Sequence, residues 1–323
     1  MPRIAPDLND QIVWPLTETS GAYRNVGVLS PNDASTDLTL TITGSVIRTG
    51  SALFTGNSLW VPGTSDVPVG SAATRNYAAG AKDINIAPPL TVSCWVNIRA
   101  YTTSNVTTFI GKEYRDSSIT SSWTTPFHAI SISTLTTNGG GDWRVLVALS
   151  ASTTASITIT DFPIPIGMWS HIGITHDGTN IRAFLNGCQC MYYSGATQLF
   201  TTAASTISYT DGTNGFGFWR VGAITATGSA NKEEPNANIQ DVRIANVARP
   251  ASYFKRVYEA GALPLRAGGF TAAQYYKLRA YDTSCVTPTP VVWVDTEVSL
   301  ANAPAFPCSG PYTTPEVLDT WYA

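Results

Sequence analysis

The stretch "WSHIGITHDGTNIRAFLNGCQC", from Trp169 to Cys190, decides the fold class. It contains two turn dipeptides, Asp177-Gly178 and Asn186-Gly187, each flanked by residues in which apolar and polar side chains alternate. Asp-Gly and Asn-Gly adopt positive φ at low steric cost and are strong hairpin signals. The stretch therefore predicts a meander of three antiparallel strands, over residues 169–176, 181–186 and 188–194.

The same stretch holds two of the three histidines and two of the five cysteines, a composition that suggests a metal site. Side chains alternate across a strand, so His171 and His176 are predicted to project to opposite sides of the sheet. Cys188 and Cys190 share a face, but zinc sites usually space their cysteines by about two to four residues. Neighbouring side chains of one strand are also poorly placed for a disulfide. We therefore predict two buried strand residues and no metal site here.

The composition favours β-structure and excludes some partners. Only 13% of the 323 residues are charged, against about 25% in typical soluble domains. The chain has 26 glycines and 20 prolines and is rich in Ser, Thr and Asn, which is typical of short strands joined by many turns. The net charge is −3 and no basic stripe occurs, so we expect no nucleic-acid partner.

Neither end of the chain suggests a leader or a membrane anchor. The opening "MPRIAPDLNDQIVWPL" lacks an apolar stretch long enough for a secretion signal, and no later run approaches a membrane span. We therefore expect no membrane insertion and read the cysteines as buried free thiols. A disulfide between Cys285 and Cys308 stays open as an alternative.

Strand signals recur every 8 to 12 residues up to about residue 247, which predicts an all-β, two-sheet antiparallel sandwich. In "LTVSCWVNI" (Leu90 to Ile98), the side chains of Leu90, Val92, Cys94 and Val96 share one face. A short helix is predicted near residues 250–260, between Pro250 and Gly261.

The character of the chain changes near Ala262. We place a domain over residues 1–262 and a Pro-rich C-terminal extension over residues 263–323. The extension contains a helix-compatible stretch, Thr271 to Tyr281, and a strand-like run, "PVVWVDTEV". We expect it to pack either on its own domain or on a neighbouring subunit.

Five segments in register resemble one known family. The 169–190 stretch contributes Trp-x-His, an alternating strand, an Asp-Gly turn and "IRAFLNG". The other four segments are "IVWPLTETSG", "GSALFTGNSLWVPG", "LTVSCWVN" and "ANIQDVRIANVARPASYFKRVYEAG". Together they resemble the laminin-G-like branch of the concanavalin A-like lectin superfamily. The resemblance implies a jelly roll, stops near Ala262 and leaves the extension outside it.

The resemblance also raises the question of calcium, which some family members bind at the rim of the sandwich. Calcium takes six to eight oxygen ligands, and rim acids would supply them. The paired acidic position of the closing strand is Gln240-Asp241 here, so one carboxylate is missing, and Asn57 replaces another acid. The remaining calcium candidates are Asp116, Asp142 and Asp241, with Asp211, Glu233 and Glu234 as further rim acids.

The sequence argues against an enzyme. Glucanases of the superfamily place two carboxylates on one strand face, as in Glu-x-Asp-x-Glu. No such set occurs, because Glu233 and Glu234 are adjacent and the 112–116 segment separates its acids. Three histidines and no Gly-x-Ser-x-Gly elbow make a hydrolase triad improbable as well.

Carbohydrate binding is one remaining function, because sugars stack on exposed aromatic rings and hydrogen-bond to Asn, Asp and Arg. The loop "YTDGTNGFGFWR" is the best candidate for such a site. The candidate ligand-binding residues are Tyr209, Asp211, Asn214, Phe216, Trp219, Arg220, Trp123 and Trp143. The alternative is that the tryptophans fill the core of the sandwich.

A structural role is the other remaining function, in a viral or phage particle that displays the domain on its surface. The chain is rich in Ser and Thr, poor in charge, and carries a Pro-rich extension too poor in charge for a solvated tail. We expect virion or assembly subunits as partners, homo-oligomers formed through the extension, and a virion-surface location, with an extracellular one as the alternative. A soluble or secreted carbohydrate-binding module, with or without calcium, is the alternative function.

Overall fold

The structure is a computed structural model that falls into two compact units, residues 1–258 and 259–323. The residues that it describes are 4–20, 22–29, 40–43, 47–49, 53–54, 57–61, 77–80, 84–100, 107–113, 128–134, 142–150, 153–159, 163–194, 197–209, 219–222, 235–267, 276–281 and 290–296.

The first unit is built from two antiparallel sheets. The nine-stranded sheet has the order β13-β12-β11-β6-β18-β4-β3, with β1 paired to β18 and β16 paired to β12. Its strands are β1 (Asp10–Trp14), β3 (Ile47–Thr49), β4 (Ser58–Val61), β6 (Leu90–Ile98), β11 (Trp169–His176), β12 (Asn180–Leu185), β13 (Cys188–Gln189), β16 (Thr202–Ala203) and β18 (Ala237–Ala245).

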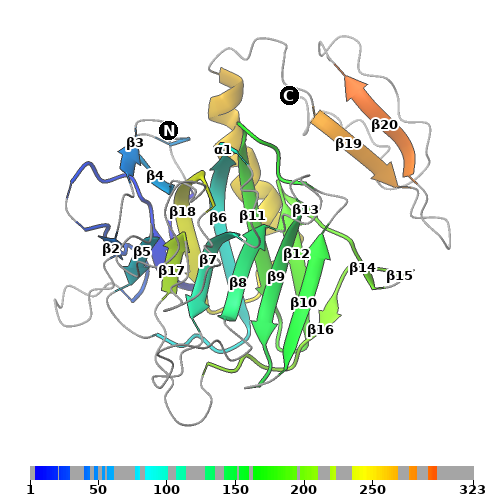
Figure 1. The fold of residues 1–323 in the computed structure, drawn as a ribbon, viewed down its shortest axis with the longest axis horizontal. Coiled ribbons are helices and arrows are strands. Elements are labelled where there is room, and N and C mark those ends of the chain that lie inside the picture. The colour runs from blue at the N-terminus through cyan, green and yellow to red at the C-terminus, as the bar shows by residue number, and fades with distance from the viewer. Residues whose placement is uncertain are drawn as a thin grey trace, which may run out of the picture. The chain divides into compact units, whose positions relative to one another are not determined.

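The seven-stranded sheet has the order β10-β9-β8-β7-β17-β5-β2. Its strands are β2 (Leu40–Thr43), β5 (Tyr77–Gly80), β7 (Thr107–Glu113), β8 (His128–Thr134), β9 (Trp143–Ala148), β10 (Thr154–Ile159) and β17 (Trp219–Gly222). In Figure 1, β7 to β10 lie in front of β6 and β11. The prediction of an all-β, two-sheet antiparallel jelly-roll sandwich is confirmed.

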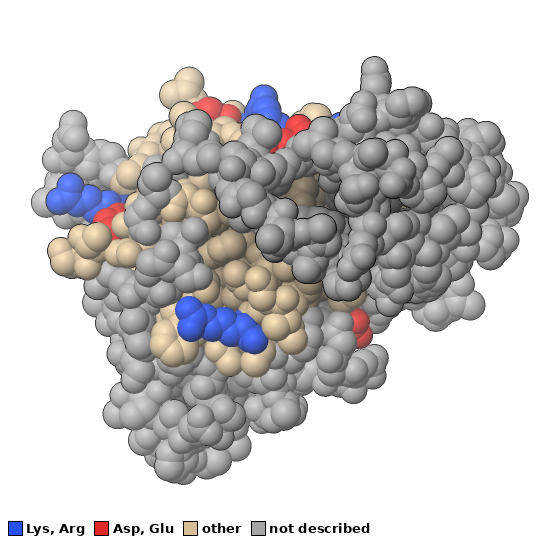
Figure 2. All heavy atoms as spheres, turned by 90° about the horizontal axis from the view of Figure 1, so that it is seen from above, with Lys and Arg blue, Asp and Glu red and all other residues tan. Residues whose placement is uncertain are grey.

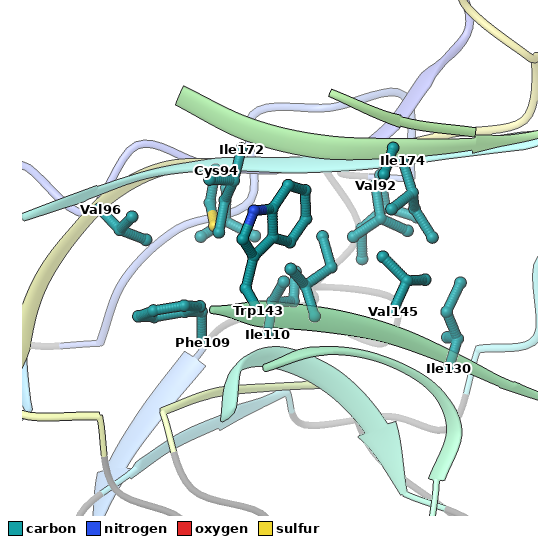
Figure 3. Close-up of a cluster of buried hydrophobic side chains, with 14 of the residues drawn as sticks. Val92, Cys94, Val96, Phe109, Ile110, Ile130, Trp143, Val145, Ile172 and Ile174 are labelled. Carbon is teal, nitrogen blue, oxygen red and sulfur yellow. The ribbon is translucent and has the colours of Figure 1, made fainter. Parts of the chain in front are cut away.

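The core lies between the two sheets and follows from strand alternation. Val92 and Cys94 of β6 face the same way as Ile172 and Ile174 of β11, because Cys94 pairs with Ile172 and Val92 with Ile174. Figure 3 shows these side chains against Val145 and Ile130 of the other sheet. The indole of Trp143, which is 0% exposed, fills the space between the sheets.

The helix α1 (Ala251–Ala267) covers the outer side of the nine-stranded sheet with its first turns. Phe254 stacks on Phe184 of β12 with ring centroids 4.0 Å apart. Gly173 of β11 permits this approach, because a Cβ there would lie 2.5 Å from Cε1 of Phe254. The prediction that the helix ends near Gly261 is wrong. Glycine costs about 1 kcal/mol in a helix interior, too little to end a helix by itself.

The predicted third strand of the meander, residues 188–194, is also wrong as a single element. The strand β13 pairs with only the end of β12, while β16 pairs with the start of β12. Because two segments share that edge, the chain turns away at Cys190, and β14 (Tyr192–Ser194) pairs with β15 (Thr197–Leu199) instead.

A buried ion-pair network fixes the N-terminal segment to β18 and to the start of α1. Arg243 of β18 pairs with Asp241 at 3.0 Å and with Asp10 at 3.7 Å, and it donates a hydrogen bond to the backbone oxygen of Ile4. Arg249 pairs with Asp10 at 2.9 Å. Charged groups with such partners are tolerated in an interior.

The second unit contains an antiparallel pair, β19 (Tyr276–Tyr281) and β20 (Pro290–Thr296). The strand-like run is therefore confirmed, but the helix-compatible stretch is a strand over its described part. Its sequence YKLRAY alternates polar and apolar residues, which suits a strand. The domain boundary near Ala262 stays a prediction, and it falls within α1.

Candidate functional site

The outer face of the seven-stranded sheet carries hydroxyl groups and guanidinium groups in two rows across the strands. One row contains Thr158 of β10, Arg144 of β9, Ser133 of β8 and Thr108 of β7, as the strand registers show. The neighbouring row contains Ser156, Leu146, Ser131, Gly111 and Arg220. Strand alternation sends the apolar residues of these strands into the core and these polar residues outward.

Hydrogen bonds join the hydroxyl groups at the centre of this face. Oγ1 of Thr108 and Oγ of Ser133 are 3.2 Å apart, and Oγ of Ser133 donates to Oγ of Ser131 at 3.4 Å. All three side chains are buried. They therefore make a fixed polar floor, since buried hydroxyl groups that are hydrogen-bonded to one another hold a defined orientation.

The face is accessible toward the edge strand β10. Thr154 and Ser156 are exposed, and Thr158 and Arg144 are partly exposed. This edge offers hydroxyl donors and acceptors beside a guanidinium with five donors. The sequence contained a signal for it, because "HAISIST" and "TASITI" place Ser or Thr at alternate positions. These residues were not among the predicted ones, because the prediction centred on one loop and on tryptophans outside these strands' polar faces.

The predicted loop is fixed at both of its ends. The hydroxyl of Tyr209 donates to the backbone oxygen of Ile86 at 2.6 Å, and Nε1 of Trp219 donates to that of Ile84 at 3.0 Å. Burial raises the pKa of Tyr209 above its usual value. Nζ of Lys112 lies 5.5 Å from the centre of the Tyr209 ring. These contacts hold the segment before β6 in place. The rings of Tyr209 and Trp219 therefore support the fold.

Apart from Tyr209, the candidate sugar-binding residues separate into three groups. Trp143 and Trp219 are 0% and 1% exposed, so their rings belong to the core and offer no face to a sugar. Arg220 points to the outer face, away from its neighbour Trp219. Four candidates lie outside the described residues: Asp211, Asn214, Phe216 and Trp123.

The calcium candidate of the closing strand, Asp241, and its neighbour Gln240 both have other partners. Asp241 is 2% exposed, has a φ of 49° at a bulge and forms the ion pair with Arg243. Oε1 of Gln240 accepts hydrogen bonds from the backbone N–H groups of Leu53 and Phe54 at 2.9 and 3.1 Å. These two side chains therefore do not fit a calcium ligand set. Asp142 is buried, and Asp116, Glu233 and Glu234 lie outside the described residues.

His171 and His176 lie on opposite faces of β11, as predicted. His171 faces α1, with its ring 5.2 Å from that of Trp95 and 6.0 Å from that of Phe254. Burial, with a smaller effect of Arg243, lowers the pKa of His171 to about 3. Nδ1 of His176 accepts a hydrogen bond from the N–H of Gly178 at 3.0 Å. Both histidines are therefore neutral residues of the fold at neutral pH.

The described cysteines are free thiols, and no metal cluster surrounds them. Cys94 and Cys190 are buried, and burial raises the pKa of Cys188 to about 12. Within the described ranges, no group of three or more His, Cys, Asp or Glu side chains could hold a metal ion. Cys285 and Cys308, and the disulfide between them, lie outside these ranges.

A large part of the sandwich matches a known family by sequence. Residues 71–252 match the family described as the concanavalin A-like lectin/glucanases superfamily, in its laminin-G-like form. The chain belongs to this superfamily. The resemblance drawn from the sequence motifs is therefore confirmed. A search of curated proteins gives no match to the chain.

Several solved structures are similar to the chain at low sequence identity. The receptor-binding domain of botulinum neurotoxin D is 10% identical, with a TM-score of 0.49 and coverage of 79% of this chain and 53% of that one. Domain 4 of the arabinanase AbnA from Geobacillus stearothermophilus, solved with arabinotriose, is 15% identical, with a TM-score of 0.46 and coverage of 77% and 98%. A Trypanosoma rangeli sialidase is 10% identical, with a TM-score of 0.46 and coverage of 78% and 33%. The chain thus spans about half of the neurotoxin domain and a third of the sialidase.

Proposed function

We propose that the chain is a non-enzymatic attachment protein that binds glycans through the outer face of its seven-stranded sheet. The observation that carries the proposal is the edge of this face along β10, where Thr154, Ser156, Thr158 and Arg144 are exposed or partly exposed. The buried hydroxyl floor of Thr108, Ser131 and Ser133 lies beside this edge and supports it. Sugar hydroxyls are recognised by groups of this kind, which both donate and accept hydrogen bonds. A rigid sheet face holds such groups in place without loss of entropy on binding.

The strands of this face supply few acids for hydrolysis. A glycosidase needs two carboxyl groups that flank the scissile bond, either about 5–5.5 Å or about 6.5–9.5 Å apart. The seven described strands of the sheet contain a single acidic residue, Glu113. This composition favours binding over cleavage.

The remaining predicted residues fit the same proposal as additions to this face. Trp123 and Phe216 would supply the aromatic rings on which a sugar stacks. Asp211 and Asn214 would supply hydrogen bonds, and calcium would join through rim acids such as Asp116. Each of these roles is a prediction from the sequence.

We further propose that the domain is displayed on the surface of an assembly, most simply a virion, with an extracellular module as the alternative. Support comes from the low charge of the chain and from the second unit, whose strands β19 and β20 form a sheet of their own. Figure 2 shows few charged side chains, scattered over the described part of this surface without a patch of one sign. We expect other virion subunits, or copies of this chain held through residues 263–323, as partners. No helix in the described ranges is long and apolar enough to cross a membrane.

A glycan array with the full chain, run with and without calcium, tests the binding proposal. We expect the sugars that bind the wild type to bind Arg144→Ala at least tenfold more weakly, while Arg24→Ala, an exposed arginine elsewhere, binds normally. Each bound glycan should be recovered intact after incubation. Cleavage would overturn the non-enzymatic proposal, and binding unchanged in Arg144→Ala would overturn the proposed face.

Light scattering tests the assembly proposal separately. The full chain should self-associate as its concentration rises, and a chain that ends at Ala267 should not. A full chain that stays monomeric at every concentration would remove the support for homo-oligomers formed through the second unit.

A further inference from the structure

A cross-strand row of aromatic and amide side chains lies on the outer face of the other, nine-stranded sheet. Trp169 of β11 pairs with Asn97 of β6, Asn97 pairs with Asn238 of β18, and Asn238 pairs with Trp60 of β4. The row thus reads Trp-Asn-Asn-Trp across four adjacent strands. Directly opposite residues have side chains close enough to act together.

Strand alternation shows that the row faces outward. Trp95 and His171, two residues along from Asn97 and Trp169, contact each other and the α1 residues Tyr258 and Phe254 outside the sheet. Asn97 and Trp169 share that face, because side chains two apart point the same way. Both are partly exposed, as is Trp60.

Arg99, just after β6, is held in one position beside this row. Its guanidinium carbon lies 4.5 Å from the centre of the Trp60 ring, and its Nη2 donates to Oδ1 of Asn238 at 3.2 Å. Its backbone N–H donates to the backbone oxygen of Asn236 at 2.9 Å. The side chain of Arg99 is nevertheless exposed. Stacking and one hydrogen bond therefore fix the guanidinium while most of its five donors stay available.

The row divides into groups that position and groups that can bind. Trp60 lies against the guanidinium, and Asn238 is 2% exposed and bonded to it, so both position Arg99. Trp169 offers an aromatic surface. Within the described part of the chain, the side chain of Asn97 makes one long hydrogen bond, 3.5 Å from its Nδ2 to the backbone oxygen of Gly167. An aromatic surface, an amide and a fixed guanidinium thus lie in sequence across the sheet.

The geometry points to a second saccharide site here, one that takes an acidic sugar. The apolar face of a pyranose ring stacks on Trp169, its hydroxyls reach Asn97, and its carboxylate accepts paired hydrogen bonds from Arg99. The strands of Trp169 and Asn238 flank β6, so about 10 Å separates them, a span that a sugar with its carboxylate can bridge. A planar guanidinium matches a carboxylate in two hydrogen bonds, which a neutral sugar lacks.

This site is independent of the glycan-binding face proposed above, because the two lie on different sheets. Isothermal titration of the full chain with an oligosaccharide of glucuronic acid, beside the glucose oligosaccharide of the same linkage and length, tests it. We expect the acidic ligand to bind at least tenfold more tightly, and more weakly as salt is added, because the ion pair is screened.

Three variants assign the binding to these residues. Arg99→Ala should lose the preference for the acidic ligand, and Arg99→Lys should regain part of it, since a point charge replaces the fork. Trp169→Ala should weaken both ligands. Arg182→Ala, at a partly exposed arginine of the same sheet paired with Asp177 at 2.5 Å, is the control and should bind like the wild type.

The outcomes separate the two sites. Equal affinity for the two oligosaccharides, no binding of either, or an acid preference that survives in Arg99→Ala would overturn the second site. Binding of the glucuronic acid oligosaccharide that Arg144→Ala abolishes and Arg99→Ala leaves intact would also overturn the second site, and it would support the first face. A thermal melt of each variant shows whether a loss of binding comes from unfolding. If Arg99→Ala unfolds, the titration of Arg99→Lys decides the question alone.

Discussion

The outer faces of the two sheets differ in what covers them. Each sheet packs one face into the core and leaves the other face outside it. The nine-stranded sheet covers part of its outer face with the first turns of α1, which bury Phe254 and Tyr258 against Phe184 and Trp95. The seven-stranded sheet instead places Ser, Thr and Arg outward and bonds the hydroxyls to each other.

This difference suggests that the face under α1 contributes mainly to stability and the hydroxyl face mainly to recognition. Apolar burial under α1 stabilises the fold in proportion to the area removed from water. Exchanging hydroxyl–water bonds for hydroxyl–hydroxyl bonds adds little net stability but fixes polar groups in space. We therefore expect large stability effects from substitutions under α1 and small ones on the hydroxyl floor.

Phe254→Ala should show the largest effect. The ring stacks on Phe184 and contacts His171, and it is 0% exposed. Removing a buried Phe ring leaves a cavity, so we expect a loss of about 3–5 kcal/mol in the free energy of unfolding, measured by urea denaturation.

Leu146→Ala is the matched control for this substitution. Leu146 lies on the outer face of the other sheet and is partly exposed, so its loss should cost about 1 kcal/mol or less, well under the range for a buried Leu. If both substitutions lowered the free energy of unfolding equally, the two faces would not differ in their contribution to stability.

The pH dependence of stability should also originate under α1. Burial holds the pKa of His171 at about 3 in the folded chain, against about 6.5 when unfolded. The unfolded chain therefore binds the proton first, so this contribution is complete above pH 6.5 and is lost as the pH falls toward 3. Between pH 6.5 and 5 the loss should be about 2 kcal/mol.

His171→Phe isolates that contribution, because it keeps a ring against Trp95 and removes the titrating group. Urea denaturation at pH 6.5 and at pH 5 should show a smaller change in this variant than in the wild type. An equal change in both proteins would place the acid sensitivity elsewhere.

The sequence predicted correctly those turns and strands whose conformation depends on residues close to them in the chain. The turns at Gly178 and Gly187 have the positive φ expected of Asp-Gly and Asn-Gly, and β6 spans the predicted residues 90–98. The third meander strand failed because its length depends on β16, a distant segment that competes for the same edge. The residues of 188–194 themselves carry no signal that another segment will pair with the same edge of β12.

The site was harder to predict than the fold for the same reason. Asn97, Asn238 and Trp60 become a row only through the registers of β6, β18 and β4, which the sequence does not state. Gln240 was interpreted as a lost calcium ligand. The structure shows that its amide tethers the loop at Leu53 and Phe54, a role that an acid could not fill completely.

Ser133→Ala should show a small stability effect, similar to that of Leu146→Ala, and gives the sharpest test of the comparison. The hydroxyl bonds to Thr108 and Ser131, but alanine fills nearly the same space, so the loss should be about 1 kcal/mol. Glycan binding should fall at the same time, because Ser133 lies directly opposite Arg144 and its hydrogen bonds fix the floor that supports the exposed edge. A loss above about 2 kcal/mol would mean that the hydroxyls stabilise the fold as strongly as the aromatic residues under α1. A small loss with weaker binding would instead mean that this sheet face is maintained for recognition.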